Sequence, residues 1–414
     1  MNTISKLLLT TAVATSMSGV AVGQDSEIEA LKKSIEALNK KVEELEKKSA
    51  TVKKAEPAMS IGTSDGNFEM NLRGRLYIDY SDISGMDAGT EFRTARMGIE
   101  GKAWKDLKYK FEADFADNDV DVKDAYMELS TGVGKVRVGQ FKEFASLDEQ
   151  TSSRHTAFME RASFTDAFGI SRATGIAYGN GGDTWTFKTG VYKGSFSSEG
   201  EGQTTFAARA TYGGEMEGGV WMIGASARVR DRGDSSLRYR QRPHQHRADR
   251  VINTGSLVGN KDNMFGAEAA ATFGSFWVSS EFSHLTAKDS GAMGRDGTMW
   301  GGYVDAGFFL TGETRPLKLG KGAWDRPKVN NPVQEGGMGA WAIAARYDRI
   351  DLTSDGIYGG QMDTIVLGVN WYLNRHSRVL FNYNHSEVEK MGGPLNTDGK
   401  ADYDGFGVRF QVDW

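Results

Sequence analysis

The chain has 414 residues, a formal net charge of −5, 52 glycines, 6 prolines and no cysteine. This length suits two ordinary domains or one large barrel. No run of about 18 apolar residues occurs, which excludes membrane-spanning helices but not a membrane barrel, because barrel strands are only half apolar. The lack of cysteine excludes a disulfide framework and thiolate metal sites. Scarce proline favours a sheet without edges, since proline survives mainly on edge strands.

Residues 1–23 have the composition of a secretory signal peptide. A single lysine, Lys6, precedes a short apolar stretch, and small residues stand at Ala21 and Gly23. This pattern predicts export of the protein, with cleavage close to residue 23.

Residues 24–49 carry a heptad pattern, which predicts a coiled-coil helix in the periplasm. About two and a half heptads are marginal for an isolated helix in water, so partner chains are expected. β-branched residues at a and leucine at d favour two strands, although a larger oligomer downstream could override this preference, and a single solvated helix is the alternative. The apolar positions are Ile28, Leu31, Ile35, Leu38, Val42 and Leu45.

Residues 50–66 are predicted to be a linker, because they hold Pro57, small residues and a Gly-containing turn. From residue 67 to residue 414 the apolar pattern has a period of two, in segments of about ten residues. Short connections such as 374–377 alternate with long polar ones such as 230–262. Short turns on one side and long loops on the other are typical of an outer-membrane barrel.

Two architectures share this alternation. A soluble sandwich or propeller hides the apolar face in a core, whereas a membrane barrel exposes it to lipid. The polar face here carries Arg, Lys, Glu and Asp in close succession, which suits a charged, water-filled lumen. Residues 67–414 are therefore predicted to form an all-β, antiparallel transmembrane barrel of about 16 strands.

Five stretches of the barrel region are distinctive: GQFKEFASLDEQTSSRHTAFMERA (139–162), RYRQRP (238–243), FFLTGETRPLKLGKGAWDRPK (308–328), GAWAIAARYDRIDL (339–352) and GVNWYLN (368–374). With them the chain resembles one known family, the phosphate- and polyphosphate-selective porins (porin O/porin P) of Gram-negative outer membranes. The resemblance covers roughly residues 67–414 and leaves out the heptad segment. It implies a location in the bacterial outer membrane and a 16-stranded barrel, usually a homotrimer, whose anion-conducting lumen is narrowed by inward-folded loops.

The resemblance also implies basic residues along the lumen, because a dehydrated phosphate in a narrow pore needs fixed cations that do not hold it too long. Arginine offers bidentate donors to oxyanions, and lysine a mobile point charge. Lys142 and Arg154 flank the segment expected to fold inward as the constriction loop. Residues of matching type and face on the lumen wall are Arg73, Arg75, Arg96, Lys102, Lys108, Lys110, Arg137 and Arg409.

Residues 228–250 form a second basic feature, expected to lie at the entrance. A basic loop at a pore mouth would concentrate anions and raise their entry rate. Binding of lipopolysaccharide phosphates, or simple solvation, is the alternative. Two histidines on this loop do not make a metal site, and no metal or other cofactor is expected. The entrance arginines are Arg238, Arg240, Arg242, Arg247 and Arg250.

The expected function is passive uptake of small inorganic anions, phosphate or polyphosphate. Acidic residues such as Glu69, Glu112 and Asp114 share the lumen face, so a general, weakly selective diffusion porin stays open, with residues 25–49 tethering the membrane to the cell wall. Outer-membrane lipid and lipopolysaccharide are expected partners, and nucleic acid is not. Histidine is scarce (6), and no acyl-transfer motif surrounds the His-Ser pairs at 376–377 and 385–386, so an enzyme is not expected.

Overall fold

The computed structural model describes residues 24–48, 51–54, 59–194, 202–390 and 399–414, so the predicted signal peptide at 1–23 lies outside the described residues. The elements are α1 (Gln24–Lys48), β1 (Thr51–Lys54), β2 (Met59–Gly62), β3 (Phe68–Ile83), β4 (Gly89–Ala103), β5 (Leu107–Asp114), η1 (Ala116–Asn118), β6 (Asp121–Thr131), β7 (Gly134–Lys142), α2 (Leu147–Gln150), α3 (Ser163–Ala167), β8 (Arg172–Gly181), β9 (Trp185–Tyr192), β10 (Gln203–Met216), β11 (Gly219–Arg232), β12 (Arg240–Gln241), β13 (Ile252–Asn253), β14 (Lys261–Phe273), β15 (Phe276–Ala287), η2 (Ala292–Gly294), β16 (Gly297–Phe309), β17 (Leu317–Lys318), β18 (Ala323–Trp324), η3 (Val333–Glu335), β19 (Ala340–Ser354), β20 (Ile357–Tyr372), β21 (Ser377–Lys390) and β22 (Gly399–Asp413).

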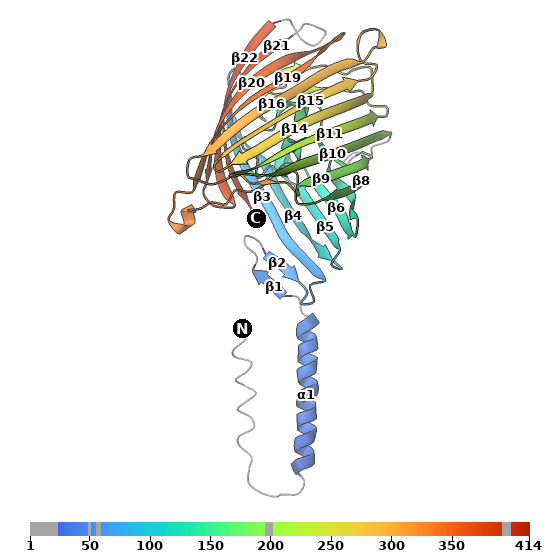
Figure 1. Cartoon of the computed structure of the whole chain (residues 1–414), viewed down its shortest axis with the longest axis vertical. Helices are drawn as coiled ribbons and strands as arrows, with labels where there is room; N and C mark the ends of the chain where they lie inside the picture. The colour runs from blue at the N-terminus through green and yellow to red at the C-terminus, as the bar shows by residue number, and fades with distance from the viewer. Residues whose placement is uncertain (1–23, 49–50, 55–58, 195–201, 391–398) are drawn as a thin grey trace.

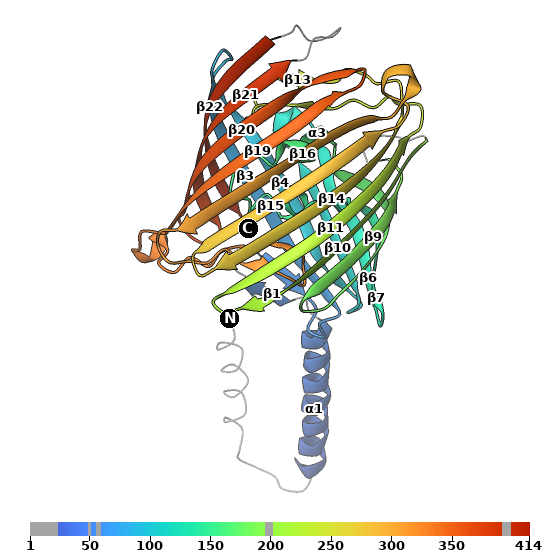
Figure 2. The same ribbon diagram turned by 45° about the horizontal axis from the view of Figure 1, so that its top comes forward.

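Sixteen antiparallel strands close into a barrel, which confirms the predicted fold class. The strands β3–β11, β14–β16 and β19–β22 follow one another in chain order, and β22 pairs with β3 to close the ring. Figures 1 and 2 show them as tilted strands around one lumen, with α1 projecting from one end. Large apolar side chains such as Phe92, Val304 and Leu367 are exposed on the outer face. No described helix is long and apolar enough to cross a membrane.

The barrel closes at its last residue. The backbone N–H of Trp414 donates to the oxygen of Gly74 at 3.1 Å, and the N–H of Gly74 donates to the oxygen of Trp414 at 3.0 Å. The indole of Trp414 lies directly against Gly74, where a Cβ atom would come within 2.2 Å of the ring. Only glycine leaves room for this contact.

The structure differs from the predicted linker at residues 51–54 and 59–62, which form the antiparallel hairpin β1–β2. β2 pairs with the start of β3, where Ser60 stands opposite Asn71 and Gly62 opposite Glu69. These strands have four residues each, too few for a period of two to stand out from small and polar neighbours.

Three long connections fold into the lumen. Segments 143–171 and 233–260 enter from the end opposite α1, as the predicted layout of long loops on one side requires. Segment 310–339 enters from the α1 end, where short turns were expected. It meets the first loop, since the side chain of Arg315 donates to the backbone oxygen of His155 at 3.2 Å. Buried apolar residues of these loops, including Phe164, Leu237 and Trp324, form cores against the inner wall.

Candidate functional site

The loop 143–171 is fixed to one side of the barrel wall. The carboxylate of Glu281 on β15 accepts the N–H groups of Leu147 and Asp148 at 2.8 and 2.6 Å. Farther along, Asp348 on β19 accepts the N–H of Ser163 at 3.0 Å. The amide of Asn382 on β21 accepts from Met159, and Arg378 and Arg409 donate to backbone oxygens of the loop. The loop therefore lies along β15–β22, and the opposite side of the lumen stays open.

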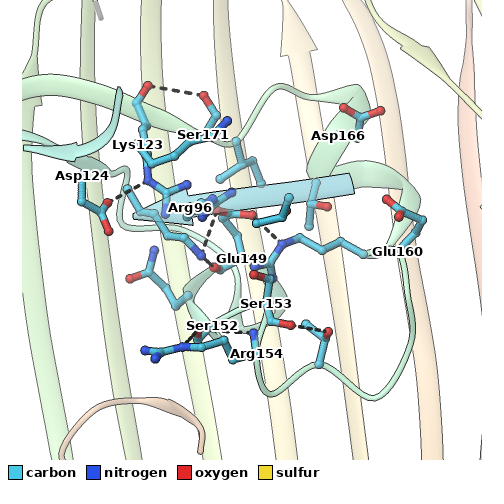
Figure 3. Close-up of a pocket in the computed structure, with 18 of the residues that line it drawn as sticks. Arg96, Lys123, Asp124, Glu149, Ser152, Ser153, Arg154, Glu160, Asp166 and Ser171 are labelled. Carbon is cyan, nitrogen blue, oxygen red and sulfur yellow. Dashed lines mark hydrogen bonds and ion pairs between the residues drawn. The ribbon is translucent and has the colours of Figure 1, made fainter. Parts of the chain in front are cut away.

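A cavity of about 940 Å³ fills that open side, between the loop and strands β3–β8. It reaches from Arg73 and Glu100 on the barrel wall to Arg242 and Arg250 on the loop 233–260. Its lining includes fifteen Lys and Arg residues and five Asp and Glu residues. Figure 3 shows loop residues such as Arg154 and Glu149 gathered with strand residues such as Arg96 around this space. The lining is therefore strongly positive.

Acidic residues on the same wall lie behind the arginines. The carboxylate of Glu112 is shared by Arg73, Arg75 and Arg96, at 3.2, 3.1 and 3.3 Å. Asp114 also pairs with Arg96, at 2.7 Å. The three arginines line the cavity, whereas the carboxylates of Glu112 and Asp114 do not. Glu112 therefore orients all three arginines. Together with Asp114, and with Glu100, which pairs with Arg73, it balances their charge, but the arginines are the groups that Glu112 and Asp114 leave facing the cavity.

Most of the residues singled out in the sequence converge on this cavity. It is lined by Arg73, Arg75, Arg96, Lys110, Arg137, Lys142, Arg154, Arg242, Arg250 and Arg409. The amino group of Lys142 is also bound to the backbone oxygens of Glu149 and Thr151. It therefore stabilises the loop besides contributing charge.

Five of the expected residues lie away from the cavity. Lys102 and Lys108 stand opposite each other beside the β4–β5 turn and are exposed. The period of two predicted their face, but it carries no information on their depth along the barrel. Arg238 and Arg240 line a second hollow of about 590 Å³ together with Arg242 and Arg250. Arg247 lines neither space.

Sequence reasoning missed Arg93, which lines the cavity although alternation from Arg96 would aim it at lipid. A β-bulge explains this: Tyr77 pairs with Thr94, but the next residue, Ile78, pairs with Phe92. The extra residue reverses the alternation. An arginine on an otherwise apolar face was the available signal. Arg161 and Arg172 were also missed, since residues inside and just after an irregular loop have no periodicity to read.

Three buried donors of the lining have no acceptor among the described residues: Arg93 Nε, Arg161 Nη1 and Arg242 Nε. Each guanidinium is held by other contacts. Arg161 binds Glu149 at 3.0 Å, Arg93 binds Glu160 at 3.4 Å, and Arg242 donates to the backbone oxygen of His246. A buried donor without a partner costs about 1–3 kcal/mol, so these three guanidinium groups are held in place at some cost to stability.

Two groups of the loop 143–171, Glu160 and His155, keep their charge state in moderate acid. Burial favours the neutral form of Glu160, but the guanidinium groups of Arg93 and Arg409 lower its pKa to about 2. Burial, together with Arg326 and Arg154, lowers the pKa of His155 to about 3. His155 is therefore neutral at physiological pH, and its contact with Asp325, at 3.5 Å, is not an ion pair.

Replacing His155 with glutamine is expected to reduce the acid sensitivity of the fold. In the native chain the unfolded state takes up a proton near pH 6.5 and the folded state only near pH 3. Stability is therefore lost as the pH falls between these values. Thermal unfolding in detergent at pH 7 and pH 4 measures the loss. If the native protein and the glutamine variant lose equal stability between pH 7 and pH 4, the lowered pKa of His155 is contradicted.

Comparisons with known proteins agree with this geometry. The family described as phosphate-selective porin O and P matches residues 70–414. A Caulobacter vibrioides protein is 31% identical over 376 residues, covering 85% of this chain and 75% of its own. Porin O of Pseudomonas aeruginosa is 26% identical over 414 residues, which cover 87% of this chain and 92% of Porin O.

Two solved structures share the fold. An anion-selective porin from Comamonas acidovorans has a TM-score of 0.54 at 15% identity and covers 83% of this chain and 99% of its own. The trimer form of OmpT, an outer membrane protein of Vibrio cholerae, has a TM-score of 0.55 at 12% identity. The match covers 83% of this chain and 99% of the OmpT chain. With the family matching the whole barrel, this chain belongs to the phosphate-selective porin O and P family.

Proposed function

We propose that this porin is a channel in the outer membrane for passive uptake of small anions, phosphate or polyphosphate. The observation that carries the proposal is the cavity lined by three times as many cationic as acidic residues, eleven of them arginines. Oxyanions accept several guanidinium N–H groups at once. The family, and the anion-selective porin of similar fold, support the same reading.

The proposed path begins at the hollow lined by Arg238 and Arg240, where positive charge raises the local anion concentration. An anion then passes Arg242, Arg93 and Arg161, whose guanidinium groups line the cavity and replace its lost hydration. Beyond the loop it meets the arginines around Glu112. Because these arginines already share a carboxylate, they bind the anion only partially and allow it to leave.

Ion selectivity in planar bilayers tests the proposal. Under a KCl gradient the reversal potential should show preference for chloride, and added phosphate should block the chloride current. A cation-selective channel would overturn the proposal. Chloride current unaffected by phosphate would instead favour a general diffusion porin.

Arg161→Gln is expected to weaken phosphate block roughly tenfold or more, because a hydrogen bond to a charged group contributes about 1.5–3 kcal/mol. Glu149 keeps its pairing with Lys142 in this variant, so the loop should stay in place. The matched control is Arg295→Gln, an exposed arginine paired with Asp355 outside the barrel strands. Equal phosphate block in both variants would remove Arg161 from the anion path.

We further propose that the protein is a homotrimer in contact with outer-membrane lipid and lipopolysaccharide. The trimer form of the Vibrio cholerae protein of similar fold supports this assembly.

The second candidate is a general porin whose residues 25–49 tether the membrane to the cell wall, favoured by the projection of α1 away from the barrel. Deleting 25–49 should then weaken the envelope without changing the conductance.

A further inference from the structure

The helix α1 presents an apolar stripe to solvent. Ile28, Leu31, Ile35, Leu38 and Val42 lie on it, and they are 44–62% exposed. Every residue from 28 to 44 is exposed. Such a short helix gains most of its stability from packing its apolar face, so this face requires a partner.

We propose that the stripe packs against α1 of other copies of this chain, in a parallel, in-register coiled coil. Copies of a barrel inserted in one membrane turn the same end toward the same compartment. Helices that leave from that end therefore run in the same direction. β-branched residues at a and leucine at d suit parallel helices. An antiparallel pair would require one barrel to be inverted.

Charge along the stripe agrees with this direction. In a parallel coiled coil, a g residue of one helix lies beside the e residue five positions later in the next helix. By sequence position, residues 27 and 32 form one such combination, and residues 41 and 46 form another. Each combination joins a glutamate to a lysine. Parallel copies in register would therefore attract one another at both ends of the helix.

The connection to the barrel fixes both register and orientation. Only residues 49 and 50 separate α1 from β1, so the three Cα–Cα steps from Lys48 to Thr51 span at most about 11 Å. β1 and β2 are adjacent strands on the edge of β3, each about 4.8 Å from the next. The end of α1 therefore lies within roughly 20 Å of β3. A shared helix bundle draws the β3 sides of neighbouring barrels toward one axis.

Cysteine cross-linking tests the inference, because the chain has no cysteine of its own. Leu31→Cys lies at a d position near one end of the stripe, so only parallel helices in register bring two copies of residue 31 together. Oxidation in native membranes is expected to join most chains of this variant in covalent pairs on denaturing gels. Lys33→Cys, exposed on the opposite face of the same helix turn, is the matched control and should stay monomeric.

No excess of cross-linking in Leu31→Cys over Lys33→Cys would overturn the inference. The inference rests on the proposed porin only for the common membrane orientation, and conductance separates the two. Anion-selective channels without cross-links would refute the helix bundle and leave the porin intact. Cross-linked chains without anion selectivity would do the reverse.

Discussion

Glu281→Ala is expected to enlarge the pore and reduce its selectivity. Glu281 is buried, and its carboxylate accepts both N–H groups at the start of α2 and the hydroxyl of Tyr303 at 2.8 Å. Without it, two buried N–H groups lose their acceptor, at about 1–3 kcal/mol each. Retreat of the loop 143–171 from the wall then becomes favourable. Single-channel conductance should rise severalfold, and the reversal potential in a salt gradient should move toward zero.

Thr364→Ala is the control for this variant. Thr364 is buried on the same inner wall, and its hydroxyl bonds Ser386 on the neighbouring strand at 2.9 Å. It should conduct like the native protein. Tyr303→Phe removes one contact of Glu281 and should give a smaller effect than the alanine variant. If Glu281→Ala conducts like the native protein, the remaining contacts hold the loop without this carboxylate, and the prediction is wrong.

Gly74→Leu is expected to prevent closure of the barrel. Any side chain at this position meets the indole of Trp414 at 2.2 Å and the backbone oxygen of Arg96 at 2.9 Å. The backbone at Arg96 cannot yield without losing pairing between β3 and β4, and the indole of Trp414 would have to turn away from the seam. Overpacking by a methylene group costs about 1–3 kcal/mol, and leucine adds four heavy atoms. The fraction of folded barrel on unheated gels should fall severalfold.

Gly132→Ala provides the matched comparison. Gly132 lies in the β6–β7 turn, where an added Cβ has no neighbour within 4 Å among the described residues. This variant should fold like the native chain. If Gly74→Leu folds as well as Gly132→Ala, the seam tolerates displacement of Trp414 and the prediction is wrong.

The barrel and much of its basic lining could be predicted because both follow from alternation along single strands. Arg73, Arg75 and Arg409 lie on the cavity as the period of two requires. Depth along the barrel has no such signature, which is why Lys102 and Lys108 were misplaced. The role of Glu112 depends on strand register, which brings arginines from β3 and β4 to one carboxylate on β5.

The loops were harder to predict. Segment 310–339 gives no periodic signal that it enters the lumen from the α1 end, and its position follows from contacts with the loop 143–171. The side of the barrel left open depends on which wall residues accept the N–H groups of that loop. Acidic residues weakened the sequence argument for an anion channel. In the structure, two of them, Glu112 and Asp114, lie behind arginines of the cavity, and two further acids of the wall, Glu281 and Asp348, hold the loop away from the basic wall.

The hairpin β1–β2 has a consequence for how the barrel closes. Along one edge of β3, β2 occupies the positions opposite residues 69–71, and β22 occupies those opposite 75–83. Trp414 at Gly74 comes to rest just short of β2. A two-residue slip of the closing strand toward the helix would keep every side chain on its correct face, so alternation alone cannot prevent it. Such a slip would bring Trp414 opposite Leu72. The register that pairs Ser60 with Asn71 places Met59, the first residue of β2, at that same position, so the hairpin blocks the slip and Arg409 stays opposite Asp79.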